Sequence, residues 1–246
     1  MKEQSCTECN DFMPLKKRIT SFFSEREKYK IEWQMMQYTL ATILILGIII
    51  EVLAFSLLKD NTIYLKNIPW LWYLIITIAV VFGALWHIRA HKVQVSSMMG
   101  MMIGMILGMQ AGTMLGIVIG STNGMFMGSL FGMLFGIFVG VYASNSCGLM
   151  GILNGTIMGT MGGTMGTMLA LMMKVDYILW FMPFFTIVNI LILWGLNFLV
   201  FEEIVEGKKV IREGVGFITF FVSCLIMTAL MIVIILYGYT SAFAAL

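Results

Sequence analysis

Methionine side chains recur at helical spacing in one part of the chain. Between residues 158 and 172 they stand three or four positions apart, and between residues 101 and 109 they stand four apart. Such spacing places side chains on one face of a helix. Thioether sulfurs are soft ligands that select Cu(I) over hard cations and bind without losing a proton. The predicted metal ligands are Met158, Met161, Met165, Met168 and Met172, helped by Met101, Met105 and Met109.

The same methionines have a purely structural interpretation. Methionine is flexible and fills irregular gaps, such as those opposite glycine grooves. Leucine would pack such a face equally well, yet 17 of the 24 methionines lie between Met98 and Met173. The sequence leaves both interpretations open.

Two further pairs of residues have the spacing of metal ligands. Cys6 and Cys9 form a CxxC motif, which is half of a four-ligand site or a mobile dithiol. His87 and His91 stand at positions i and i+4 of one helical face, a chelating arrangement. Alternatively, the thiols are incidental to an unstructured tail and the histidines mark the cytoplasmic end of an apolar segment. If all four are ligands, they exchange metal on the cytoplasmic side.

Glu51 is the one carboxylate well inside an apolar run, which extends from Leu44 to Leu58. An ionisable group within a membrane is costly and is a functional candidate by default. It is predicted to accept a proton or a cation in the outer half of the membrane. The alternative is that it reaches the outer interface and meets Lys59 or Lys66.

Charge excludes several classes of function. Residues 93 to 173 contain no charged side chain, so the centre of the chain has no group for acid–base chemistry. We therefore expect no enzymatic activity. The net charge is only +2, which offers no basic face for a nucleic-acid partner.

The elements that position these residues are predicted to be membrane helices. Of the 246 residues 60% are apolar and 11% are charged, and the mean hydropathy is +0.94. A water-soluble domain of this size buries only about 70–75% of its surface and cannot hide so many apolar side chains. We expect an all-α integral membrane protein with a polar N-terminal segment, residues 1–36, and a transmembrane domain, residues 37–246. The apolar runs, each close to the roughly 20 residues of a membrane span, cover residues 37–58, 70–90, 97–120, 124–143, 149–173, 178–200 and 216–238.

Positive charges predict the orientation of these seven spans. With the N-terminus inside, 12 of the 15 Lys and Arg residues fall in cytoplasmic segments, and only Lys59, Lys66 and Lys174 fall outside. This distribution predicts a multi-pass protein of the plasma (inner) membrane with a cytoplasmic N-terminus and an external C-terminus.

Glycine marks the core of the predicted bundle, residues 97–173. It recurs at every fourth position from Gly100 to Gly140, a run too long for one crossing, so a turn at Ser121-Thr122-Asn123 is expected to divide it. Rows of glycine let a second helix approach closely, as in GxxxG packing. The residues assigned to helix packing are Gly100, Gly104, Gly108, Gly112, Gly116, Gly155, Gly159, Gly162 and Gly166.

The segment Asn154-Gly155-Thr156-Ile157-Met158-Gly159-Thr160-Met161, continuing to Leu169, resembles Gly/Met-rich bacterial membrane proteins. The resemblance covers the central third of the chain, including Met98-Met99-Gly100-Met101-Met102. Some of these proteins are joined to cupredoxin-like domains, so the resemblance implies a role in handling copper or another heavy metal.

Three functions from different classes follow from these patterns. The leading hypothesis is binding or transport of Cu(I) through the methionine thioethers. The second is a non-catalytic scaffold or assembly subunit in the lipid bilayer, whose glycine grooves pack against copies of itself or another membrane subunit. The third is a small-solute permease that uses Glu51 for proton coupling.

Overall fold

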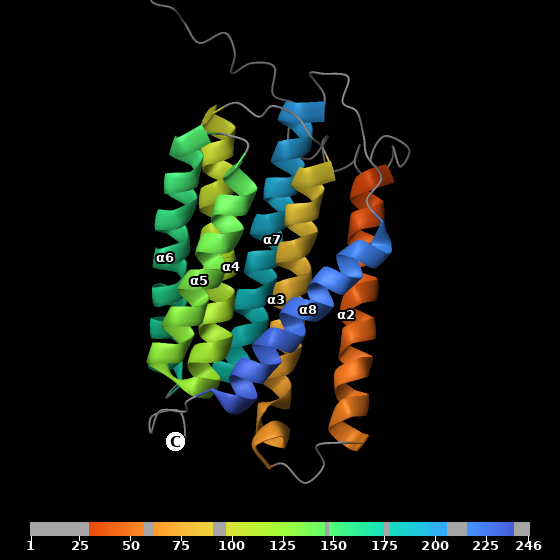
Figure 1. Cartoon of the computed structure of the whole chain (residues 1–246), viewed down its shortest axis with the longest axis vertical. Helices are drawn as coiled ribbons and strands as arrows, with labels where there is room; N and C mark the ends of the chain where they lie inside the picture. Colours follow the sequence, from red (N-terminus) through yellow and green to blue (C-terminus); the bar gives the residue numbers. More distant parts are fainter. Residues whose placement is uncertain are drawn as a thin grey trace, which may run out of the picture.

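The computed structural model describes residues 30–56, 62–90, 97–145, 148–174, 178–205 and 216–238. Within these ranges the chain forms seven α-helices and no strand, so the all-α expectation is confirmed (Figure 1). The helices are α2 (Lys30–Ser56), α3 (Thr62–Ala90), α4 (Ser97–Asn123), α5 (Met125–Ser144), α6 (Gly148–Met173), α7 (Ile178–Val205) and α8 (Phe217–Tyr237).

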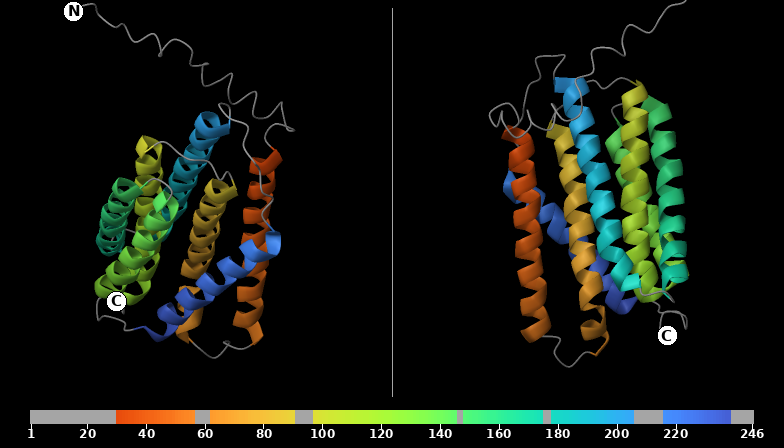
Figure 2. Two further views of the ribbon diagram at one scale, coloured as in Figure 1. Left: turned by 45° about the horizontal axis from the view of Figure 1, so that its top comes forward. Right: turned by 180° about the vertical axis from the view of Figure 1, so that it is seen from behind.

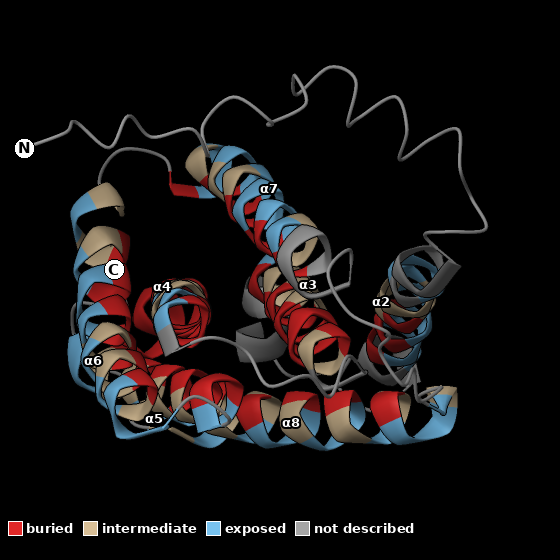
Figure 3. Cartoon of the chain, turned by 90° about the horizontal axis from the view of Figure 1, so that it is seen from above, coloured by how far each residue is buried: buried red, intermediate tan, exposed pale blue. Residues whose placement is uncertain are grey.

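The helices form a bundle in which α2 to α7 alternate in direction, while α8 crosses obliquely over α3 and α2 (Figures 1 and 2). Seen from above, α4 lies between α5 and α6 on one side and α3 and α7 on the other (Figure 3). Its most extensive contacts are with α6 and α5. Helices α4, α5 and α6 therefore form a closely packed group on one side of the bundle, which we call the trio.

Five helices of the described chain are long and apolar enough to cross a membrane, and these are α3, α4, α5, α7 and α8. In α2 the described part of the apolar stretch runs from Met36 to Val52. Helix α6 is 26 residues long but is not among the five, because its many glycines and threonines lower its hydropathy. The multi-pass membrane class thus agrees with the expectation, and the number of seven spans stays a prediction.

Two helix ends differ from the sequence expectation. The predicted turn at residues 121–123 is wrong, because α4 continues through Asn123 and the chain reverses at Gly124, whose φ is 104°. Only glycine adopts such a φ at no steric cost. The hydroxyls of Ser121 and Thr122 donate to main-chain carbonyls one turn earlier, so these residues stay helical. Helix α2 also begins at Lys30 rather than at residue 37.

Asn123 joins the end of α4 to the end of α8. Its side chain is 1% exposed, and its Nδ2 donates to the carbonyl oxygens of Ile234 and Ile235, each at 3.3 Å. Its Oδ1 lies 2.8 Å from the hydroxyl of Thr122, whose one proton is shared between this oxygen and the carbonyl oxygen of Val118 at 3.1 Å. All polar groups of the amide are thereby engaged among apolar helices, where an unsatisfied group would be costly.

Glycines of the trio lie against main-chain atoms of the neighbouring helices. A β-carbon on Gly112 of α4 would lie 2.8 Å from the main-chain nitrogen of Gly163 of α6. A β-carbon on Gly140 of α5 would lie 2.6 Å from the carbonyl oxygen of Gly155. These distances are shorter than a van der Waals contact, so a side chain at either position would force two helices apart.

We predict that Gly112→Ala destabilises the protein, because main chain cannot move aside as a side chain can. Overpacking of this kind costs about 1–3 kcal/mol, and the thermal unfolding of purified protein in detergent measures it. Gly195→Ala in α7 is the matched control, because no heavy atom lies within 4 Å of its β-carbon position. Equal melting temperatures for the two variants would contradict the prediction.

Candidate functional site

The predicted methionine ligands of α6 lie on the outside of the trio. Met161, Met165, Met168 and Met172 are 47%, 53%, 50% and 62% exposed, and we call this set the methionine face. Met158 is half-buried beside it. The opposite side of α6 is formed by buried glycines, among them Gly155 and Gly159. Met161, Met168 and Met172 therefore fill no gap beside the glycines.

The threonines of α6 use their hydroxyls within the helix bundle. Thr156 donates to the carbonyl oxygen of Ile152 at 2.8 Å, and Thr164 donates to that of Thr160 at 3.1 Å. Buried Thr167 donates to Gly163 and also to Gly116 of α4, at 2.8 and 3.3 Å. Hydroxyls bonded in this way satisfy themselves in an apolar environment and offer their protons to no ligand.

The contacts between α4 and α6 fix the register of their methionines. A β-carbon on Gly162 would lie 3.0 Å from Cα of Met109, and Gly166 packs in the same way on Thr113. Both contacts join residues separated by the same number of positions, and both helices run in the same direction (Figure 1). One turn earlier along both helices, the same row of contacts leads to Met105 on α4 and Met158 on α6. We call this line of contact the α4–α6 seam.

Both predicted methionine rows therefore meet at one seam. Met109 is 37% exposed, while Met101 and Met105 are half-buried. Met101 falls level with Asn154 in the same register. Sequence periodicity predicts each row separately but does not indicate that they adjoin.

The trio itself has no channel between its helices at these levels. A β-carbon on Gly108 of α4 would lie 2.9 Å from the carbonyl oxygen of Gly155 in α6 and 3.3 Å from that of Gly136 in α5. Three helices in mutual main-chain contact leave no width for an ion. Any metal held by these methionines lies on the outer surface of the trio or along its seams.

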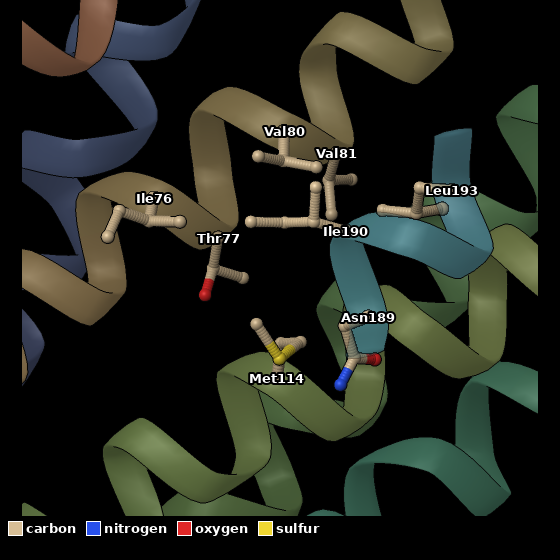
Figure 4. Close-up of a pocket in the computed structure, with 8 residues that line it drawn as sticks. All are labelled: Ile76, Thr77, Val80, Val81, Met114, Asn189, Ile190 and Leu193. Atoms are coloured by element: carbon tan, nitrogen blue, oxygen red, sulfur yellow. The ribbon is translucent and has the colours of Figure 1, made fainter. Parts of the chain in front are cut away.

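A small cavity lies elsewhere, between α3, α4 and α7 (Figure 4). Five aliphatic side chains line it together with Thr77, Met114 and Asn189. Its volume is about 10 Å³, close to the minimum that one water molecule requires. The polar groups are already bonded within their helices, since Thr77 donates to Tyr73 and Asn189 to Phe185, both at 2.7 Å.

The other candidate residues are placed as follows. His87 is 1% exposed in α3, while its proposed partner His91 lies outside the described residues, as do Cys6 and Cys9. Among the described residues no group of three or more His, Cys, Asp or Glu side chains is arranged to hold a metal. The ligand roles of Cys6, Cys9, His87 and His91 stay predictions.

Glu51 is exposed on α2. Lys59 lies outside the described residues, and so does the side chain of Lys66. Both interpretations of this carboxylate therefore stay predictions.

In comparisons with known proteins, no family model, no curated protein and no solved structure matches the chain. The function of the chain is therefore inferred from its own residues.

Sequence reasoning missed two features of the α4 helix. It did not place Met114 of α4 beside Thr77 of α3 and Asn189 of α7, because a periodic pattern identifies a face of a helix but not the helices that pack against that face. It also treated Asn123 as a turn residue. A signal was present there, because an amide among apolar helices needs partners.

We predict that cysteines at positions 105 and 158 form a disulfide on oxidation, because the register places them side by side. The test uses the chain with its four native cysteines replaced, bearing M105C and M158C, and follows cross-linking by the mobility shift after proteolysis between the two helices. M105C with M172C is the control, since residue 172 lies about 21 Å farther along the helix axis at 1.5 Å per residue. Cross-linking of the control alone would show that the register is wrong.

Proposed function

We propose that the chain is a non-catalytic membrane protein that binds a soft monovalent metal ion, most readily Cu(I), through the methionines of α6 and α4. The observation that carries the proposal is the outward direction of the methionine face. A methionine used as filler belongs beside the glycines, whereas Met161, Met168 and Met172 are exposed and have no glycine one turn before or after them. Exposed thioethers are free to turn toward a ligand.

The electrostatic setting supports a soft monovalent ion. No charged residue occurs from residue 93 to residue 173, so a hard divalent cation would meet neither carboxylate nor counter-charge there. Hard cations prefer oxygen ligands, and thioethers favour Cu(I). Because the trio is closed by main-chain contacts, we propose that the ion binds and moves along the α4–α6 side of the trio.

The proposal includes an orientation. Lys30 and Arg89 lie in terminal turns of α2 and α3 at one end of the bundle, while Lys66 and Lys174 lie in α3 and after α6 at the other. The N-terminal segment, which carries most of the remaining positive charge, precedes α2 at the first end. By the positive-inside rule we propose that this end is cytoplasmic and that the membrane is the plasma membrane.

A second candidate is an assembly subunit, a copy or partner of which covers the methionine face. In the sequence-based version of this hypothesis the partner packs on the glycine grooves. Several of these glycines, among them Gly112 of α4 and Gly162 and Gly166 of α6, instead contact main chain of the same protein. This leaves the methionine face as the surface for such a partner.

We predict that the purified chain binds Ag(I) or Cu(I) under reducing conditions, and that replacing Met158, Met161, Met165, Met168 and Met172 with leucine abolishes most of this binding. Leucine keeps the apolar area but removes the sulfur. Equilibrium dialysis with metal analysis measures the bound ion, on a C6S/C9S background so that the thiols do not dominate. The expected loss of affinity is roughly tenfold or more, since second-shell changes alone cost about 10–100-fold.

The matched control replaces five other exposed methionines with leucine, namely Met36, Met98, Met102, Met125 and Met150. It should bind as the parent does. If the parent binds no more metal than a methionine-poor membrane protein, the metal proposal is wrong. An oligomer of the parent that persists in the α6 variant would then favour the assembly candidate.

A further inference from the structure

The α4–α6 seam brings three methionines around one glycine. Met109 of α4 lies with its Cα 3.0 Å from the β-carbon position of Gly162 in α6. On the surface of α6, the residues one turn before and after Gly162 are Met158 at i−4 and Met165 at i+3, with β-carbons about 5–6 Å from its position. The main chain of Met109 therefore lies against the part of α6 that Met158 and Met165 flank.

Residue 162 places no side chain between the three methionines. Gly162 has no side chain, and Gly166 below it packs directly on the main chain of Thr113. Met158 is half-buried, while Met109 and Met165 are 37% and 53% exposed. Methionine has three rotatable bonds and a polarizable sulfur, so the thioethers are free to turn toward a shared point above Gly162.

The position of this point in the membrane restricts its ligand. Met109 lies near the middle of the apolar span Met98–Asn123, so an ion there has exchanged water for protein and lipid. A multivalent ion held by three neutral sulfurs in that setting carries a high desolvation cost. A singly charged, weakly hydrated soft ion carries the lowest cost and gains the most from thioethers.

We infer that Met109, Met158 and Met165 form one discrete site for a single Cu(I) ion, built from two helices. This inference rests on the proposed function and narrows it, because it assigns the ion to three methionines at the seam, of which only Met165 belongs to the methionine face. Met161 and Met168 lie farther around α6 from Gly162 and take no part in the site. The α4 ligand is its distinguishing feature.

The test compares single leucine variants of the full-length chain on the C6S/C9S background. M109L, M158L and M165L should each lower Ag(I) affinity roughly tenfold or more, since each removes a ligand. M161L and M168L, which remove equally exposed thioethers, should bind as the parent does. The M109L/M165L double variant should lose little more than either single variant once the site is broken.

A measurement without substitutions supplements this series. Limited oxidation by peroxide, read by mass spectrometry, should show that Ag(I) protects Met109, Met158 and Met165 but not Met161 or Met168. Loss of binding in M161L and M168L with normal binding in M109L would overturn the seam site while leaving the proposed function intact. Absence of any binding by the parent would overturn both.

Discussion

Main-chain contact between α4, α5 and α6 is the constraint on which the rest of the structure depends. Hydrocarbon tails are as apolar as side chains, so helices in a membrane gain little by hiding apolar surface from lipid and associate through close packing instead. At Gly112 and Gly140 the main chain of α6 is so close that a β-carbon on either glycine would lie within 2.8 Å of a main-chain atom. The contact fixes the register of α4 against α6, and the register in turn decides which methionines are neighbours.

The same constraint explains why the methionines face outward. A helix that commits one side to glycine contacts has no room there for a long side chain, so its methionines emerge on the remaining surface. In α6 this surface holds Met161 and Met168. Gly162 has two effects, because it has no side chain. It lets α6 pack so closely on α4 that no ion fits between them, and it leaves no side chain between Met109 and the neighbouring methionines of α6.

The order and approximate ends of the helices were predictable, because apolar runs of membrane length alternate with polar segments. The break between α4 and α5 was misplaced by a few residues, since Ser121, Thr122 and Asn123 are common in turns but here bond to carbonyls of helices. The direction of the methionine face was not predictable, because the sequence separates glycine, threonine and methionine around α6 but does not say which of these faces meets another helix. Nor does a periodic row on α4 specify that α6, rather than α3, is its neighbour.

The composition of α6 also affects how the protein is made. The translocon releases a segment into lipid according to its apolarity, and α6 falls below the level reached by α4 and α5. Most of its glycines, together with Thr167, face its neighbours in the finished bundle. We therefore expect α6 to leave the translocon together with α5, from which only a short connection separates it, and to be retained by the two helices already inserted. Biogenesis of the protein thus depends on the order in which its helices are synthesised.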